Sequence, residues 1–227
     1  MSRRSRPRNM IRRSPARRGV VAALTGAVTL VVLSTIVPLS AHASLLCTQT
    51  ITGPHSGVIT VASGQKLCLN GAIQDGAVNV NAGGALSVTN KSIITGAVTL
   101  KSGFDDLQFC DSTTVRGAIS ATGSQGYVHI GGNDLLVLAC AANTIDGAVT
   151  LDANNGTIKL ANNKIAGAVT ASGNQGGLLH LGGTTISGNQ IGGSLTCTGN
   201  IPAPNNAGVS NAVSGGRSGQ TCAVSTF

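Results

Sequence analysis

Six cysteines are the residues of this chain best suited to covalent chemistry or metal binding. They are widely spaced along the sequence, at Cys47, Cys68, Cys110, Cys140, Cys197 and Cys222. No Cys-x-x-Cys pair occurs, which disfavours zinc ribbons and dithiol redox motifs. An even number of separated cysteines is typical of exported, disulfide-stabilised proteins. We therefore expect disulfides, although six cysteines allow fifteen pairings.

Two histidines in similar contexts are candidates for a metal or anion site. His129 lies in a Tyr-Val-His-Ile segment and His180 in a Leu-Leu-His-Leu segment. If both point outward from strands on either side of Lys159, the lysine opposes cation binding. A separation of about 10 Å would also prevent the two imidazoles from sharing one ion. We predict two exposed polar side chains and no metal site.

Adjacent carboxylates at Asp105 and Asp106 are similar to the paired aspartates of β-helix pectin hydrolases. Neighbouring residues in a strand point to opposite faces, whereas a glycosidase needs its two carboxylates on either side of one sugar bond. The chain also has no glutamate, no tryptophan and few aromatic residues for a sugar platform. A carbohydrate-active enzyme is therefore the least favoured interpretation, and a turn explains the pair better.

Two other polar segments have the composition of calcium loops. Asp152 begins Asp-Ala-Asn-Asn-Gly, and Gly131 begins Gly-Gly-Asn-Asp. Each offers a single carboxylate, which is too little charge for tight calcium binding, so we interpret both as tight turns. No Gly-x-Ser-x-Gly nucleophile elbow is present either. We predict no catalytic residue, no metal ion and no cofactor.

A recurring pentapeptide related to Gly-Ala-Val-Thr-Leu indicates the elements that carry these side chains. Its copies begin near every twentieth residue, at Gly57, Gly76, Gly96, Gly117, Gly147, Gly167 and Gly193. A repeat of this length is typical of a solenoid, and the alternation of apolar and polar residues favours strands over helices. Parallel crossovers are normally right-handed. We predict a single-domain, all-β, right-handed parallel β-helix of about seven coils of near 20 residues.

Alternation within each repeat predicts which side chains fill the interior. The third and fifth pentapeptide positions form two inward columns: Ile59, Val78, Val98, Ile119, Val149, Val169 and Leu195, and Val61, Val80, Leu100, Ala121, Leu151, Ala171 and Cys197. A second segment of each repeat supplies further inward residues: Leu67, Leu69, Leu86, Val88, Leu107, Phe109, Val128, Ile130, Ile158, Leu160, Leu179 and Leu181.

The corners and irregular spacings lead to two further expectations. Asn-x-Ile-x-Gly recurs at Asn143, Asn163 and Asn189, where we expect a left-handed backbone and amides stacked on the next coil. The two longest spacings indicate insertions after Ile130 and Leu181, projecting as loops.

Charge and hydropathy separate the first 43 residues from the rest. Eight of the fifteen basic residues lie in the first eighteen positions, and all seven acidic residues lie beyond residue 74. An apolar run and a small-x-small sequence ending at Ala43 follow the basic segment, as in an export signal. An uncleaved membrane anchor is the alternative. We expect cleavage after Ala43, a secreted protein with no stable membrane insertion, and no nucleic-acid partner, because the remaining chain is electrically neutral.

These boundaries divide the chain into a signal peptide at 1–43, an N-terminal cap at 44–56, repeats at 57–198 and a C-terminal cap at 199–227. Each cysteine has a neighbour about one coil away, which favours pairing Cys47 with Cys68, Cys110 with Cys140, and Cys197 with Cys222. The first and last of these disulfides would staple the caps.

The repeats together with the segment from Ile191 to Pro204, and the later Asn-Ala-Val-Ser-Gly and Gly-Gln-Thr-Cys222 sequences, resemble secreted actinobacterial parallel β-helix proteins of unassigned function. The resemblance covers most of the chain after residue 43, and its more specific part is the cysteine-containing C-terminal cap. It implies export and a disulfide-closed cap, and it implies no activity.

Small residues in the outward pentapeptide positions form the most regular predicted surface. Its central members are Ala97, Thr99, Ala118, Ser120, Ala148, Thr150, Ala168 and Thr170. Such a face suits contact with another surface, although small residues also simply suit a tightly wound sheet. We expect a non-enzymatic structural or surface-interaction protein of the cell envelope, whose partner is a cell-wall polymer, another surface protein or a second copy. The alternative is a ligand-binding module for ice or a polymer, similar in its Ala/Thr arrays to β-solenoid antifreeze proteins.

Overall fold

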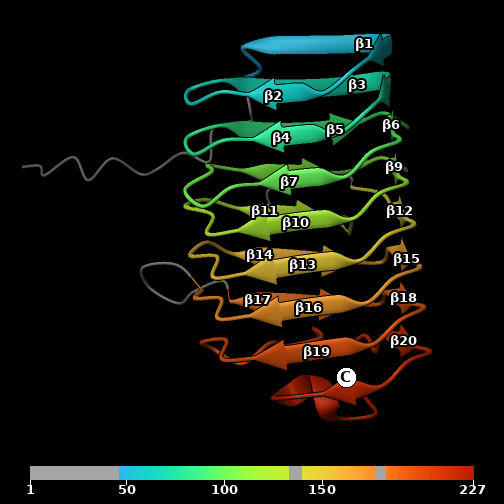
Figure 1. The fold of residues 1–227 in the computed structure, drawn as a ribbon. Helices are drawn as coiled ribbons and strands as arrows, with labels where there is room; N and C mark the ends of the chain where they lie inside the picture. The colour runs from blue at the N-terminus through green and yellow to red at the C-terminus, as the bar shows by residue number, and fades with distance from the viewer. Residues whose placement is uncertain (1–45, 133–139, 177–182) are drawn as a thin grey trace, which may run out of the picture. The chain divides into compact units, whose positions relative to one another are not determined.

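The computed structural model describes residues 46–132, 140–176 and 183–227. Within these residues the regular structure is β-strand, apart from one 3-10 turn at Thr221–Ala223. The strands form two parallel sheets, one of thirteen strands and one of eight (Figure 1). No helix among the described residues is long and apolar enough to cross a membrane.

The eight-stranded sheet is built from the pentapeptide repeats and faces the viewer in Figure 1. Its strands are β2 (Ile59–Val61), β4 (Val78–Val80), β7 (Val98–Leu100), β10 (Ile119–Thr122), β13 (Val149–Asp152), β16 (Val169–Ser172), β19 (Leu195–Thr198) and β21 (Arg217–Ser218). Every neighbouring pair is parallel, and the seven strands from β2 to β19 join equivalent pentapeptide positions, as in the register of Val149 with Ile119 and Val169. Parallel pairing between successive repeats is the arrangement of a β-solenoid, which confirms the predicted all-β class.

The thirteen-stranded sheet supplies the other two sides. One run contains β1 (Gln49–Ser56), β3 (Lys66–Asp75), β5 (Ala85–Thr89), β8 (Leu107–Phe109), β11 (Val128–Ile130), β14 (Ile158–Ala161) and β17 (Thr184–Ser187). The other run contains β6 (Ile93–Ile94), β9 (Thr114–Val115), β12 (Thr144–Ile145), β15 (Lys164–Ile165), β18 (Gln190–Ile191) and β20 (Ala212–Val213). The long strand β3 pairs with both β5 and β6, and so joins the two runs.

Aliphatic side chains fill the interior in the predicted columns. Every member that the structure describes is buried, except Ile59 in the first strand of its sheet, which is half-buried. Leu179 and Leu181 lie outside the described residues. In the register, Thr184 and Ile186 of β17 pair with Ile158 and Leu160 of β14. The prediction of an insertion after Leu181 is therefore wrong, because the strand that continues this column begins after that position.

In every pentapeptide after the first, the leading glycine lies where two layers meet closely. A Cβ placed on Gly147 would lie 2.5 Å from the backbone nitrogen of Ala118, and one on Gly117 would lie 2.5 Å from that of Ala97. Real side chains do not tolerate such distances. The recurring glycine thus permits close layer contact rather than an unusual backbone angle at these two positions.

Buried asparagines connect successive layers at two corners of the coil. The first ladder contains Asn143, Asn163, Asn189 and Asn211, and the second contains Asn154, Asn174 and Asn200 followed by Gln220. At each step the amide nitrogen of one residue donates to the side-chain oxygen of the next, as from Asn143 to Asn163 at 3.0 Å. The predicted amide stacking is confirmed.

The predicted left-handed backbone at Asn143, Asn163 and Asn189 is wrong. The positive φ angles fall one residue earlier in two layers, at Asn162 (61°) and Gly188 (64°). Because this earlier residue makes the turn of the chain, the following asparagine can point inward. The second ladder was missed by sequence reasoning, although asparagine recurs two residues after β13, β16 and β19.

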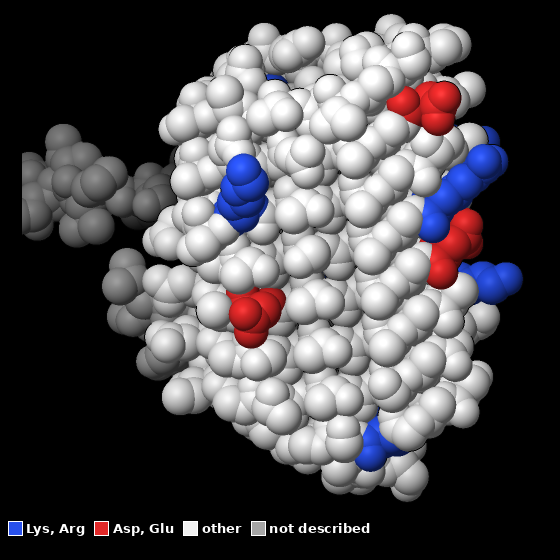
Figure 2. Space-filling model, viewed as in Figure 1, with Lys and Arg blue, Asp and Glu red and all other residues white. Residues whose placement is uncertain are grey.

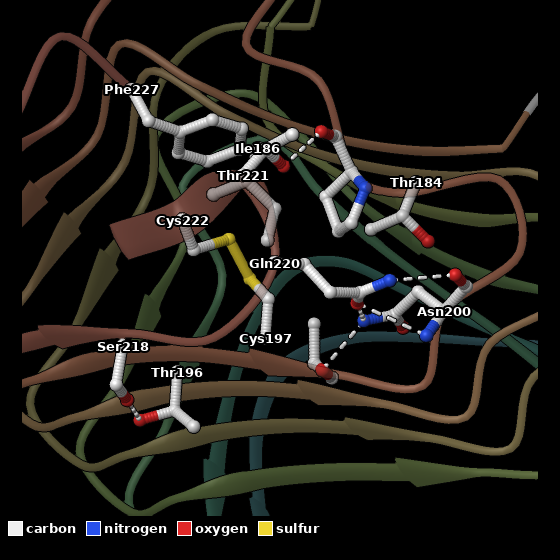
Figure 3. Close-up of a disulfide and its surroundings, with 12 residues drawn as sticks. Thr184, Ile186, Thr196, Cys197, Asn200, Ser218, Gln220, Thr221, Cys222 and Phe227 are labelled. Atoms are coloured by element: carbon white, nitrogen blue, oxygen red, sulfur yellow. Dashed lines mark hydrogen bonds between the residues drawn. A yellow bond between two sulfur atoms is a disulfide. The ribbon is translucent and has the colours of Figure 1, made fainter. Parts of the chain in front are cut away.

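Three disulfides link neighbouring layers and confirm the favoured pairings: Cys47–Cys68, Cys110–Cys140 and Cys197–Cys222. The last joins β19 to the 3-10 turn at the C-terminus, next to the contact between Asn200 and Gln220 (Figure 3). At the other end, the residues expected as a cap include β1, which pairs with β3 and adds a strand to the sheet.

Candidate functional site: a hydroxyl face and a buried cysteine–histidine cluster

The outward side chains of the eight-stranded sheet form a straight row that crosses every strand. We call this row the hydroxyl file; its members are Thr60, Asn79, Thr99, Ser120, Thr150, Thr170, Thr196 and Ser218. The pairing register places each member beside the next, and parallel strands lie about 4.8 Å apart. Only Asn79 lacks a hydroxyl group. The file extends one strand beyond the predicted members, to Ser218, whose hydroxyl lies 3.0 Å from that of Thr196.

Small side chains accompany the hydroxyl file on the same face. The residues that directly precede each strand include Ala97, Ala118, Ala148 and Ala168, all exposed or half-buried. Charged side chains lie toward the margins of this face, and its central band is uncharged (Figure 2). The face therefore offers evenly spaced hydroxyl groups, each able to donate and accept a hydrogen bond, between methyl groups.

Chemically, such a face suits contact with an extended, regular partner better than with a small molecule. A small ligand is normally held in a concave pocket with convergent polar groups. The hydroxyl file instead repeats one group at a constant interval along the stacking direction. It can match a polymer or a surface that repeats its own hydrogen-bonding groups.

His129 was predicted to be exposed, and this prediction is wrong. It lies in the centre of β11 between the inward-facing Val128 and Ile130, so its side chain projects from the outer face of the strand, as predicted. It is nevertheless fully buried. Cys140, which lies between β11 and β12 in the sequence, is also buried and is bonded to Cys110. Residues 133–139, which make up most of the insertion predicted after Ile130, lie outside the described residues, and so does His180.

Three possible metal ligands lie close together at this place. The sulfur atoms of Cys110 and Cys140 and a ring nitrogen of His129 all lie within 4.8 Å of one another. The His129 Nε2 atom lies 2.7 Å from the carbonyl oxygen of Gly132, and the Tyr127 ring meets the imidazole edge to face at 5.3 Å between centroids. In the disulfide form the two sulfurs bond each other and are not thiolate ligands.

Asp105 and Asp106 lie between the turn at Ser102 and Gly103 and strand β8, so the pair follows the turn and does not form it. The Asp106 Oδ1 atom accepts a hydrogen bond of 2.7 Å from the backbone N–H of Tyr127 in the next layer. This contact gives one member of the pair a part in joining two layers.

The two other polar segments, which begin at Asp152 and Gly131, follow strands of the coil. Asp152 ends β13, Ala153 takes a positive φ of 50°, and Asn154 enters the second asparagine ladder. Gly131 and Gly132 have φ angles of 68° and 78°, and Asn133 and Asp134 lie outside the described residues. The chain bends at Ala153 and at Gly131 and Gly132, and the asparagine contact was not predicted.

No protein-family model, no curated protein and no solved structure matches this chain.

Proposed function

We propose that this chain is a secreted, non-enzymatic structural or surface-interaction β-solenoid of the cell envelope, and that it makes its contacts through the hydroxyl file. The observation that supports this most directly is the register of the file, in which seven of eight strands present a hydroxyl side chain at one position. Its partner would be a repeating polymer of the cell wall, whose own hydroxyl groups can pair with the file.

The location proposed for the protein is extracellular. Three disulfides fit an oxidising compartment. The Arg-rich and apolar leader with its small-x-small sequence supports removal of residues 1–43 after Ala43. We further propose that the solenoid is right-handed, with about seven coils of near 20 residues, and that Cys47–Cys68 and Cys197–Cys222 staple its caps.

The test is binding of the purified protein to isolated cell-wall polymer, measured by sedimentation. Replacing Thr150 and Thr170 with lysine would place two long charged side chains in the middle of the hydroxyl file. Because the face could then no longer lie flat, we expect binding to be abolished. The matched control replaces the exposed Gln125 and Gln190, which lie outside the file, with lysine, so that the net charge changes equally.

Retention of binding by the Thr150→Lys/Thr170→Lys variant would reject the hydroxyl file as the contact surface. Equal loss in the control variant would show that the effect is one of net charge alone.

A second candidate is a ligand-binding module that recognises ice, and the constant interval of the hydroxyl file favours it specifically. An ice face is itself a regular array of hydrogen-bonding groups. Inhibition of ice recrystallisation by the unmodified chain, and its loss in Thr150→Lys/Thr170→Lys, would favour this candidate over the polymer contact. Inactivity of the unmodified chain in that assay would leave the cell-wall polymer as the ligand to test.

A further inference from the structure

The cluster of Cys110, His129 and Cys140 lies on the outer side of the thirteen-stranded sheet, beside the adjacent strands β8 and β11. Cys110 directly follows β8, and His129 lies in β11, which pairs with β8 in parallel. The Cys140 Sγ atom lies 3.3 Å from the carbonyl oxygen of Phe109. All three residues are at most 1% exposed. The three ligand atoms are therefore held by different elements and shielded from solvent.

We propose that reduction of the Cys110–Cys140 disulfide creates a binding site for one thiophilic divalent cation, with Zn²⁺ as the fitting ion, formed by both thiolates and His129. Two sulfur ligands and one imidazole are a donor set that zinc prefers. Around a tetrahedral zinc ion, sulfur and nitrogen ligands lie about 2.3 and 2.0 Å from the metal, so ligand atoms are about 3.5 Å apart. In the structure the three ligand atoms lie within 4.8 Å of one another. Once the disulfide is broken and the two sulfur atoms have moved apart, only a small approach of the imidazole nitrogen to the sulfurs is needed.

The chemistry balances with an external reductant. A dithiol transfers two electrons and two protons to the disulfide and is itself oxidised to a disulfide, which leaves Cys110 and Cys140 as thiols. The cation then displaces both thiol protons to solvent as it binds. Two thiolate charges neutralise the divalent cation, which matters because an uncompensated charge in a buried site would be strongly unfavourable.

The hydrogen bond between His129 and Gly132 supports this role. A carbonyl oxygen only accepts, so the contact at 2.7 Å places the proton of the neutral imidazole on Nε2 and the lone pair on Nδ1. A metal-bound histidine commonly donates its other ring N–H to a carbonyl in the same way, which fixes the orientation of the ring.

The other two disulfides provide internal controls. Among the described residues, the cluster at Cys110 is the one place where three such ligands come together. Within the part of the chain that the structure describes, no such group of three ligands includes the cysteines of Cys47–Cys68 or Cys197–Cys222. We therefore assign metal binding to the reduced form of Cys110–Cys140 and not to that of the other two disulfides.

The test is a Co²⁺ titration of the full chain under anaerobic conditions, before and after treatment with a phosphine reductant. We expect no thiolate-to-cobalt absorption before reduction and one equivalent of bound Co²⁺ afterwards, displaced by Zn²⁺. The variant Cys110→Ser/Cys140→Ser should lose the absorption, whereas Cys47→Ser/Cys68→Ser should keep it. His129→Gln should weaken Co²⁺ binding more than about 10-fold, since even an outer-shell partner contributes about 10- to 100-fold.

Three results would overturn the proposal. The first is the absence of cobalt–thiolate absorption in the reduced parent chain, and the second is its persistence in Cys110→Ser/Cys140→Ser. The third concerns folding, followed by circular dichroism: a reduced chain that unfolds and does not refold on adding Co²⁺ would also reject the site, because a cation bound to the folded arrangement must stabilise it.

Discussion

Buried asparagine side chains are the residues on which the stacking of layers most visibly depends. The Asn163 side chain is 1% exposed and takes part in contacts with three other residues. Its oxygen accepts from the backbone N–H and the side-chain amide of Asn143, and its nitrogen donates to Ile130 O and to the oxygen of Asn189. One side chain thus satisfies polar groups in the layers on both sides of its own.

Replacing Asn163 with alanine should therefore destabilise the protein strongly. The buried N–H groups of Asn143 and the carbonyl of Ile130 would lose partners, and each unsatisfied buried group costs about 1 to 3 kcal/mol. We expect the free energy of unfolding to fall by about 3 kcal/mol, measured by chemical denaturation. The control is Asn155→Ala at an exposed position, where a change within about 0.5 kcal/mol is expected. Similar small effects of both substitutions would contradict a structural role for the ladder.

At the scale of elements, the sequence predicts strands far better than it predicts what covers them. Alternation along a strand determines which side chains share a face, so the inward columns from Val78 to Leu195 are confirmed. The same alternation correctly places His129 on the outer face. Burial of the His129 side chain depends on contacts with residues distant in the sequence, such as Cys140, and no local pattern reports such contacts.

Corners and insertions were harder to predict for a related reason. The apolar residues Leu179 and Leu181 match the inward pattern as well as Thr184 and Ile186 do, and pairing with β14 decides between them. At the corners, asparagine suits both a left-handed backbone and an inward amide contact. The structure separates the two roles, with Asn162 turning the chain and Asn163 joining the layers.

The disulfide at the C-terminal end should stabilise its own elements rather than the whole solenoid. Each layer of a repeat protein contacts mainly its neighbours, so local loosening need not spread. In a Cys197→Ala/Cys222→Ala variant we expect faster hydrogen exchange at the amides of Asn211 and Ala223, which donate to Phe227 and Gly219. The amide of Val149, in β13, should keep its protection.

The matched variant Cys47→Ala/Cys68→Ala should show the opposite pattern, with faster exchange at Thr48, whose amide donates to Lys66. Equal loss of protection along the whole chain in both variants would contradict local stabilisation and would indicate that the solenoid unfolds as one cooperative unit.

For the molecule as a whole, the same repeat explains both stability and the proposed contact surface. Inward aliphatic columns and asparagine ladders fix the register of the layers. That register automatically places the outward threonines and serines in one straight file. A surface of this kind requires no catalytic group, since its recognition would come from the constant spacing of one polar group over many strands.

The register itself is the central claim, and through-hydrogen-bond scalar couplings measured by NMR test it most directly. Such couplings join the amide nitrogen of a donor to the carbonyl carbon of its acceptor. They should link Val98 to Ala118, Ile119 to Ala148, Val149 to Ala168 and Val169 to Ser194. Couplings within single repeats, as in β-hairpins, or between antiparallel partners would contradict the stacked parallel layers and, with them, the hydroxyl file.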